Sequence, residues 1–277
     1  YALETATDCD TEVLLKAATA GGVQAIRSFN GIFAFAQYYP DQHQLRLVRD
    51  RLGVKPLYFV DTSEYFAFAS EAKVLYTFMD RLNINPRVVH EFLRFGSSMS
   101  NDTIVEGVQK LPPGHVLEMD TRTAEFHIAP FWSVKELAET TKSPPTYNTA
   151  ITETSRLLGE AVERQCVSDV PVGAYLSGGL DSSIVVALAA QRSVKPITTF
   201  SVRFEGSPNS ELPLAREVAE RCGTSHHEME ITTRGIEADI NDLIIQYDEP
   251  FADPAALPLH LMAQKCAPLT KVILQGD

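Results

Sequence analysis

The sequence predicts an α+β domain followed by an α/β domain. In the first half of the chain, short apolar strands alternate with short polar turns from residue 32 to residue 69, which is typical of antiparallel sheets. In the second half, strands and helices alternate from residue 171 to residue 275, which is typical of a doubly wound parallel sheet. Between the two patterns lies a polar stretch with two adjacent prolines, residues 133–148, which we interpret as a linker.

The composition agrees with two globular domains and argues against several classes of protein. A chain of 277 residues with 44% hydrophobic residues is long and apolar enough for two cores. A net charge of −12 argues against a nucleic-acid-binding surface. No apolar run approaches the roughly 18 residues that a membrane span needs. We therefore expect neither nucleic acid nor a membrane as a partner.

The cysteines point to a reducing compartment. The sequence has four cysteines, far apart and without a C-x-x-C pair, at positions Cys9, Cys166, Cys222 and Cys266. This usage suits the cytosol and argues against a structural zinc site. No signal-peptide pattern opens the sequence, so we expect a cytoplasmic protein.

The first half is expected to begin with a helix and to continue as an antiparallel meander. The helix should cover residues 12–20, where apolar residues recur at mostly helical spacing, and it should end at Gly21 and Gly22. Four strands should follow, at residues 32–39, 44–49, 57–60 and 65–69.

Two helices and two more strands complete the predicted α+β domain. Ser70 is a candidate N-cap for a short helix, and Pro86 and Gly96 bracket a longer one. Strands are then expected near residues 116–119 and 125–128.

The second half is expected to open with a helix over residues 151–166 and then to alternate. The strands should lie near residues 171–176, 197–203, 226–231 and 271–275, and the helices near residues 182–191, 210–222, 233–247 and 255–267. Ligands of open parallel sheets bind beyond the carboxyl ends of the strands. Three segments leave such ends and should meet at one rim: residues 177–181, 201–204 and 275–277.

The stretch S-G-G-L-D-S-S, residues 177–183, joins a predicted buried strand to a predicted helix. Gly178 and Gly179 let the backbone approach a ligand closely, and the start of the helix presents free N–H groups and the positive end of the helix dipole. The spacing is neither that of a Walker loop, which needs a lysine, nor G-x-G-x-x-G. The stretch predicts an anion site, and the alternative is a Ser/Gly turn ahead of an ordinary helix.

This stretch resembles the pyrophosphate loop, S-G-G-x-D-S, of the ATP pyrophosphatases, which cleave ATP to AMP and pyrophosphate. The resemblance implies that the loop binds pyrophosphate and that Asp181 helps to hold Mg²⁺. A second carboxylate, Asp277, is expected at the same rim. Oxygen ligands and substrate phosphates are what Mg²⁺ prefers, so ATP and Mg²⁺ are the expected cofactors.

Four stretches of the first half resemble the class II glutamine amidotransferase domain of glutamine-dependent asparagine synthetases. They are T-D-C-D-T-E-V at residues 7–13, F-N-G-I-F-A-F-A at residues 29–36, R-D-R-L-G-V-K-P-L-Y at residues 49–58 and L-P-P-G at residues 111–114. The resemblance covers residues 1–132. It implies an Ntn-type sandwich of two antiparallel sheets between helix layers, with Asp10 contacting the amino group of bound glutamine. A solvated loop carboxylate is the alternative for Asp10.

One departure from the family concerns the nucleophile. That family hydrolyses glutamine with an N-terminal cysteine whose own α-amine is the base. Residue 1 here is Tyr1, and Cys9 is internal with no basic residue beside it in the sequence. We therefore expect the domain to be truncated and inert in glutamine hydrolysis.

The second half, residues 149–277, resembles the ATP-pyrophosphatase domain of the same synthetases, whose fold is adenine nucleotide alpha hydrolase-like. Residues 168–176 (S-D-V-P-V-G-A-Y-L), 200–208 (F-S-V-R-F-E-G-S-P) and 248–254 (D-E-P-F-A-D-P) carry this resemblance. It implies a catalytic and metal-binding role for Asp277. The expected ATP and pyrophosphate contacts are Leu176, Ser177, Gly178, Gly179, Leu180, Asp181, Ser182, Val202, Gln275 and Gly276.

Several of these residues have simpler alternatives. Leu176 and Val202 could belong to the apolar core instead of contacting adenine. The acidic residues of the stretch 248–254 could form a solvated loop or a substrate-side loop. His226 and His227 point to opposite faces of a strand, so we expect a structural or surface role rather than a shared metal.

The resemblance implies an asparagine synthase that hydrolyses glutamine. Its substrates would be aspartate, ATP and glutamine or ammonia, and it would form a β-aspartyl-AMP intermediate. The alternatives are an amidotransferase or lactam synthetase acting on another carboxylate, or a non-catalytic nucleotide-binding relative. A homodimer stays open, and we expect that residues 1–277 alone do not complete amide synthesis.

Overall fold

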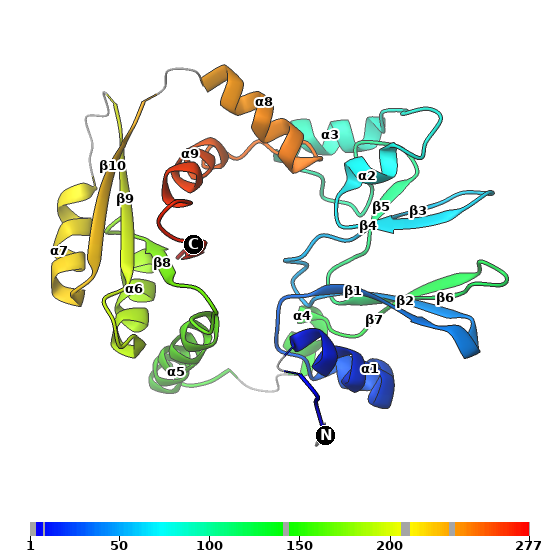
Figure 1. The fold of residues 1–277 in the computed structure, drawn as a ribbon, viewed down its shortest axis with the longest axis horizontal. Coiled ribbons are helices and arrows are strands. Elements are labelled where there is room, and N and C mark those ends of the chain that lie inside the picture. Colours follow the sequence, from blue (N-terminus) through cyan, green and yellow to red (C-terminus); the bar gives the residue numbers. More distant parts are fainter. Residues whose placement is uncertain (1–3, 8, 141–143, 206–210, 233–235, 277) are drawn as a thin grey trace. The chain divides into compact units, whose positions relative to one another are not determined.

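The computed structural model describes residues 4–7, 9–140, 144–205, 211–232 and 236–276. The chain divides into two compact units (Figure 1). Unit 1 consists of Tyr1–Lys142 together with Gln246–Ala252, and unit 2 consists of Ser143–Ile245 together with Asp253–Asp277. The expected linker contains a short helix, α4 (Val134–Thr140).

Unit 1 holds two antiparallel sheets. The first has the strand order β1-β2-β6-β7 and the second the order β4-β3-β5. The strands of the first sheet are β1 (Ala34–Tyr39), β2 (Gln44–Arg49), β6 (His115–Asp120) and β7 (Phe126–Pro130). Those of the second are β3 (Tyr58–Asp61), β4 (Phe66–Ala69) and β5 (Val108–Lys110). The helices are α1 (Asp10–Arg27), α2 (Ala72–Tyr76) and α3 (Pro86–Phe95), and a 3₁₀ turn, η1 (Pro40–Gln42), joins β1 to β2.

Alternating side chains place these elements in four layers. On β2, Leu47 packs into a core shared with Phe59 of β3, while the next residue, Val48, packs against α1. On β3, Phe59 faces that shared core, while Val60 packs with Leu75 of α2. Since successive residues of a strand face opposite sides, the two sheets lie face to face between helices. The expected sandwich of two antiparallel sheets is confirmed.

Three details of unit 1 differ from the sequence predictions. The strands do not form one meander, because the chain leaves the first sheet after β2 and enters the second at β3. The first helix breaks at Gly22, which has the non-helical angles φ 54° and ψ −145°, as the two glycines predict; a second helical stretch, which was not predicted, follows it to Arg27, where buried Ile26 packs against the first sheet. Glu71, not Ser70, is the N-cap of α2.

The longer helix has the predicted boundaries. Pro86 is its first residue, and the Asn85 side chain accepts a hydrogen bond from the Arg87 N–H. Gly96 ends it in the left-handed conformation, with φ 79°. These local signals are strong enough to define α3 without tertiary context.

Unit 2 is built on a parallel sheet with the strand order β10-β9-β8-β11. Its strands are β8 (Val172–Tyr175), β9 (Thr198–Phe204), β10 (Ser225–Ile231) and β11 (Val272–Leu274). Its helices are α5 (Tyr147–Gln165), α6 (Leu180–Arg192), α7 (Leu212–Cys222), α8 (Ile236–Tyr247) and α9 (Ala256–Cys266). The chain runs outward from β8 to β10 and then returns to the other side of β8, so the strand order reverses between β8 and β11. That reversal is the position at which open α/β sheets bind ligands.

Helices cover both faces of this sheet (Figure 1). On β8, Ala174 packs into a core with Val162 of α5, Val186 of α6 and Ala215 of α7. The next residue of the strand, Tyr175, points to the opposite face of the sheet and contacts Cys266 of α9. The predicted doubly wound α/β architecture is confirmed. Among the described helices, none combines the length and the low polarity that crossing a bilayer requires.

Candidate active site

The loop of residues 177–183 connects β8 to α6 at the rim where the strand order reverses. Gly178 has φ 84°, and a Cβ atom there would lie 2.6 Å from the backbone nitrogen of Ala215 and 2.7 Å from Cβ of Leu214. Only glycine can occupy this position without moving the start of α7. The sequence predicts that this glycine lets the backbone approach a ligand; in the structure, the close neighbour of Gly178 is the first turn of α7.

The hydroxyl groups of the loop bond to the loop itself. Ser177 Oγ and Ser182 Oγ lie 2.9 Å apart, and Ser177 Oγ also accepts a hydrogen bond of 3.1 Å from the Gly179 N–H. Ser183 Oγ donates to the Gly179 carbonyl oxygen over 2.6 Å. These bonds fix the loop before any ligand arrives, so the backbone N–H groups are preorganised for binding.

The first turn of α6 leaves backbone donors uncommitted. Its first intrahelical hydrogen bond runs from the Ser183 N–H to the Gly179 carbonyl, over 3.1 Å. The N–H groups of Leu180, Asp181 and Ser182 precede that bond and have no acceptor within the helix. Together with the helix dipole, these groups have the geometry and charge that suit an anion such as a phosphate.

The segment after β11 meets the same helix start. A Cβ atom on Gly276 would lie 2.7 Å from the carbonyl oxygen of Asp181 and 2.7 Å from the nitrogen of Ser182. The Gly276 backbone therefore packs directly on the first turn of α6, beside the exposed residue Asp181. Gln275 lies next to this contact in the chain, and Asp277 lies outside the described residues.

A cavity of about 130 Å³ opens beside the loop. Leu176, Ser177 and Val202 line it, together with Met262 of α9. Leu176 is 1% exposed and belongs to the apolar core as well as to this wall, so the two sequence interpretations of Leu176 are compatible. Residues near the carboxyl ends of β8 and β9 thus line one cavity, at the rim where the sequence predicts that these strand ends meet.

Two further residues contribute to this rim. The buried Ser201 hydroxyl donates to the Leu176 carbonyl oxygen and fixes the exit of β8. Ser201 opens one of the segments that the sequence places at the rim, but its bond to β8 had no sequence signal. Met262 reaches the cavity from α9 and lies 79 or more residues along the chain from the loop. A helix-facing methionine looks like an ordinary core residue, so only the fold identifies Met262.

The donor set at the rim suits Mg²⁺ bound to phosphate. The described part of the chain holds no cluster of three or more His, Cys, Asp or Glu side chains that could bind a metal by itself. Mg²⁺ usually keeps several waters and takes one or two protein carboxylates plus substrate phosphates. The exposed Asp181, beside uncommitted N–H groups, has the chemistry for that arrangement.

The candidate glutamine contact lies in unit 1. Asp10 is the first residue of α1 and is exposed, with its Oδ1 3.3 Å from Thr11 Oγ1 and 3.9 Å from Cys9 Sγ. The turn before it is held by Glu12, whose carboxylate accepts hydrogen bonds from the Ala6 and Thr7 N–H groups. The bond from the Ala6 N–H, together with Lys16 and Thr7, lowers the pKa of Glu12 to about 2. No local sequence pattern indicates this structural role of Glu12.

The acidic residues of the stretch 248–254 make contacts within the protein. Asp248 and Glu249 are not solvated: their side chains are 5% and 13% exposed and pair with lysines of unit 1. The third acid, Asp253, accepts a hydrogen bond of 2.8 Å from the Ala255 N–H. The solvated-loop interpretation is therefore wrong for the first two residues.

The adjacent histidines of β10 face opposite ways, as the strand geometry requires. His226 Nδ1 lies 2.9 Å from Thr199 Oγ1, whereas the His227 ring stacks on Phe200 with 5.6 Å between centroids. Burial lowers the pKa of His226. Neither ring faces the loop of residues 177–183 in these contacts, and both act as packing groups.

Two family models match successive parts of this chain. Residues 2–132 match the model described as a glutamine amidotransferase domain, and residues 153–277 match the model described as asparagine synthase.

Curated relatives extend over nearly the whole chain. The putative asparagine synthetase (glutamine-hydrolyzing) 2 of Methanocaldococcus jannaschii is 33% identical over 100% of this chain and 54% of its own length. Asparagine synthetase (glutamine-hydrolyzing) 1 of Bacillus subtilis is 31% identical over 98% of this chain and 42% of its own length. Asparagine synthetase (glutamine-hydrolyzing) 2 of Arabidopsis thaliana is 30% identical over 98% of this chain and 43% of its own length. The chain therefore spans about half the length of these relatives.

Proposed function

Because the chain belongs to the asparagine synthase family, we propose that its two units are parts of an ATP-dependent carbon–nitrogen ligase that makes asparagine. In this proposal, a side-chain oxygen of aspartate attacks the α-phosphorus of ATP. The bond from that phosphorus to the leaving oxygen breaks, which gives β-aspartyl-AMP and pyrophosphate. Ammonia derived from glutamine then attacks the activated carbonyl carbon, and AMP leaves.

One observation carries the proposal: the preorganised loop of residues 177–183 leaves three N–H groups uncommitted at the start of α6. The first intrahelical bond begins only at Ser183, so the preceding donors are available to phosphate oxygens. Negative charge develops on the pyrophosphate as it leaves. Fixed donors aimed at developing charge are a large source of rate acceleration.

The remaining rim residues have supporting roles in the proposal. Leu176 and Val202 would contact the adenine ring from the wall of the cavity, since both line it. Gln275 and Gly276 would flank the ribose and the adenylate. Gly276 packs closely on the first turn of α6, so little space separates the segment after β11 from the loop of residues 177–183.

Asp181 is the described residue that would hold Mg²⁺, and Asp277 is proposed as a second metal ligand and as the residue that takes a proton from ammonia. When bound, Mg²⁺ would neutralise charge on the pyrophosphate oxygens. In unit 1, Asp10 would bind the amino group of glutamine. Its exposure at the start of α1 supports that role, because the carboxylate is accessible to a ligand.

The binding part of the proposal is testable by calorimetry. Titration with Mg·ATP should give saturable binding, and Asp181→Asn should weaken it by roughly tenfold through loss of a metal ligand. Asp169→Asn is the matched control, because Asp169 is an exposed acid just before β8, at the opposite end of that strand from the loop. Equal affinities for the wild type and Asp181→Asn would remove Asp181 from the site.

The acceptor is testable in the full-length protein. With ATP, Mg²⁺ and ammonium, a panel of carboxylic acids should release AMP and pyrophosphate only with aspartate. Release with another acid instead would make the protein an amidoligase for that acid.

A further inference from the structure

Seven residues, the last two of α8 and the five that follow, fold with unit 1 although the chain on either side belongs to unit 2. This segment, Gln246–Ala252, follows Ile245 and precedes Asp253. Its backbone pairs with the residues that follow α3: Phe251 forms an antiparallel bridge with Ser97, and the Ala252 N–H donates to the Gly96 carbonyl over 2.8 Å. We call Gln246–Ala252 the acidic segment.

The first acid of the segment binds Lys73 at the start of α2. Asp248 Oδ1 lies 3.1 Å from Lys73 Nζ, and Asp248 Oδ2 accepts the Lys73 backbone N–H over 3.3 Å. Asp248 itself has φ 61°, a left-handed conformation that costs energy for a non-glycine residue. The contacts with Lys73 hold the segment in this strained turn.

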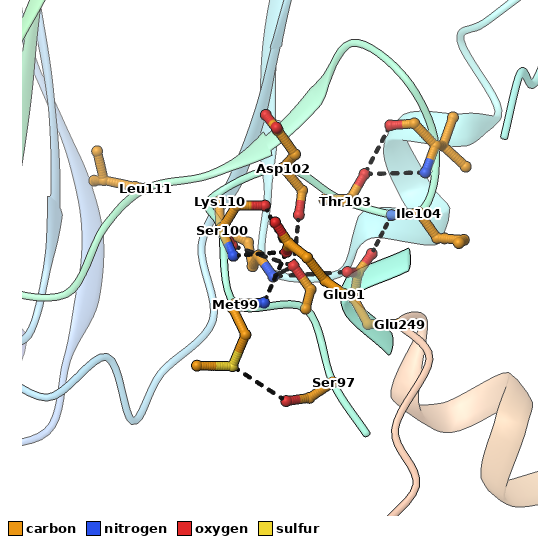
Figure 2. A network of polar contacts seen from close by, with 12 residues as sticks. Glu91, Ser97, Met99, Ser100, Asp102, Thr103, Ile104, Lys110, Leu111 and Glu249 are labelled. Carbon is orange, nitrogen blue, oxygen red and sulfur yellow. Dashed lines mark hydrogen bonds and ion pairs between the residues drawn. The ribbon is translucent and has the colours of Figure 1, made fainter. Parts of the chain in front are cut away.

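The second acid enters a site built by the residues after α3 (Figure 2). Glu249 Oε1 accepts the Ile104 N–H over 3.2 Å, and Glu249 Oε2 lies 3.7 Å from Lys110 Nζ. Lys110 Nζ is held in place by Ser98 Oγ at 3.0 Å. Glu249 therefore contacts two groups of unit 1. One is a backbone N–H in the loop before β5, and the other is the ammonium group of Lys110 at the end of β5.

Residues 97–105, which contact the acidic segment, also form hydrogen bonds with one another and with α3. Glu91 Oε2 accepts hydrogen bonds from the Met99 N–H, the Ser100 N–H and the Ser100 hydroxyl, at 2.9, 3.0 and 2.9 Å (Figure 2). Thr103 Oγ1 donates to the Val105 carbonyl over 2.9 Å. Several of the bonds that shape the site for Glu249 therefore do not involve the acidic segment.

The ion pair between Glu249 and Lys110 is imperfect. At 3.7 Å the two atoms are too far apart for a hydrogen bond, and Glu249 Oε2 has no hydrogen-bond partner among the described residues. Burial raises the pKa of Glu249 and lowers the pKa of Lys110, so for each group desolvation outweighs the attraction of its partner. A buried pair of this kind adds little net stability, because the cost of removing both charges from water offsets their attraction.

We propose that the acidic segment is an intramolecular docking motif that binds unit 1 as a single, releasable element through Asp248 and Glu249. The chain continues from the segment into the rest of α8 on one side and towards α9 on the other. The contacts of Asp248 and Glu249 with Lys73, Ile104 and Lys110 would then hold the segment against the rest of unit 1. This inference does not depend on the reaction that the protein catalyses.

Hydrogen exchange on the complete chain tests whether the segment detaches as a unit. Lys110→Met removes the partner of Glu249 without changing the segment. It should speed exchange of the Ala252 and Lys73 amides by roughly tenfold, because both amides bond through the docked segment. The Leu47 amide in β2 should keep its protection, which shows that unit 1 is folded.

Two further variants make the result specific. Lys110→Met combined with Glu249→Gln should restore the protection, since glutamine keeps the acceptor for Ile104 and removes the unpaired charge. Glu71→Gln removes the exposed partner of Lys73, whose Oε2 lies 2.8 Å from Lys73 Nζ, and should leave the Ala252 amide unchanged.

The contrary result is equally clear. If Lys110→Met changes exchange only at Ile104 and leaves Ala252 and Lys73 protected, the contacts are local and the segment is not a docking motif. If Lys110→Met unfolds unit 1, the single variant Glu249→Gln tests the same ion pair by changing the residue in the acidic segment instead. It leaves Lys110 unpaired and should likewise release Ala252 and Lys73, and unchanged protection there would overturn the proposal.

Discussion

Two loops of this protein contain an aspartate, a glycine with positive φ and several backbone donors, yet they use them in opposite ways. In unit 1, the buried Asp50 carboxylate accepts the N–H groups of Leu52 and Val54 on Oδ1, over 3.1 and 3.0 Å, and that of Lys55 on Oδ2, over 2.9 Å. In unit 2, Asp181 is exposed and its side chain leaves the donors at the start of α6 uncommitted.

The difference shows what separates a structural loop from a binding loop. In the loop of residues 50–55, the protein supplies its own anion, so the donors are already used and the chain is diverted from the first sheet to the second. In the loop of residues 177–183, serine hydroxyls fix the backbone without using the N–H groups of the first helical turn. In the proposed function, a ligand supplies the anion for these N–H groups.

The largest expected effect comes from removing the internal anion. Asp50→Ala leaves three donors in a buried loop without an acceptor, and we expect a loss of about 3 kcal/mol or more in the free energy of unfolding. Asp181→Ala should change it by less than about 1 kcal/mol, because that carboxylate is exposed. Urea unfolding of the two variants measures both values. Similar losses for both would erase the proposed difference between the loops.

A smaller effect should follow from adding one carbon to a glycine of the binding loop. Gly178→Ala combines a positive φ with a Cβ that would lie 2.6 Å from the Ala215 nitrogen. The matched control is Gly223→Ala, which has a positive φ of 64° but no atom within 4 Å of its Cβ position. We expect about 1 kcal/mol for the control and about 1–3 kcal/mol more for Gly178→Ala.

Thermal or chemical unfolding of these two variants, together with their Mg·ATP affinities, provides the comparison. Gly178→Ala should lose nucleotide binding, and Gly223→Ala should keep it. Equal stabilities would mean that the start of α7 moves freely and that the loop is not fixed by it.

The sequence determined the binding loop better than the structural one. The residues of the loop 177–183 are contiguous, and the flanking strand and helix have strong local patterns, so this part of the fold was predictable; the anion site stays a prediction. The role of Asp50 depends on where its two oxygens point, which no local pattern encodes. Gly22 interrupts α1 as its sequence predicts, but the helical stretch that follows it buries Ile26, and this tertiary contact has no local sequence signal.

The acidic segment was the least predictable feature. Asp248 and Glu249 bind groups that lie 175 and 145 residues away in the chain, at the Lys73 and Ile104 amides. A cluster of acids beside prolines is equally consistent with a solvated loop until those partners are known. Strand β5 was also missed, since three residues give no periodicity.

The smallest expected effect concerns a buried group of unit 2 that lies away from the binding loop. Burial lowers the pKa of His226, so the unfolded chain binds a proton more readily than the folded protein. Its contribution to stability should be complete above the unfolded pKa of about 6.5 and should be lost as the pH falls below it. Replacing His226 with Asn should flatten the dependence of the urea midpoint on pH between about 5 and 8.

His227 provides the control for this prediction, because its ring stacks on Phe200 at the other face of β10. His227→Asn should leave the pH dependence in place. An unchanged pH dependence in the His226 variant would assign the titration to another group.

Amide hydrogen exchange with and without Mg·pyrophosphate tests the contrast between the two loops most directly. The account predicts that saturating Mg·pyrophosphate slows exchange at Leu180, Asp181 and Ser182, whose N–H groups lack an acceptor within α6. The amides of Val54 and Lys55, which already bond to Asp50, should not change. Protection at the loop of residues 50–55, or no change at the start of α6 under saturation, would contradict the assignment of residues 177–183 as the pyrophosphate site.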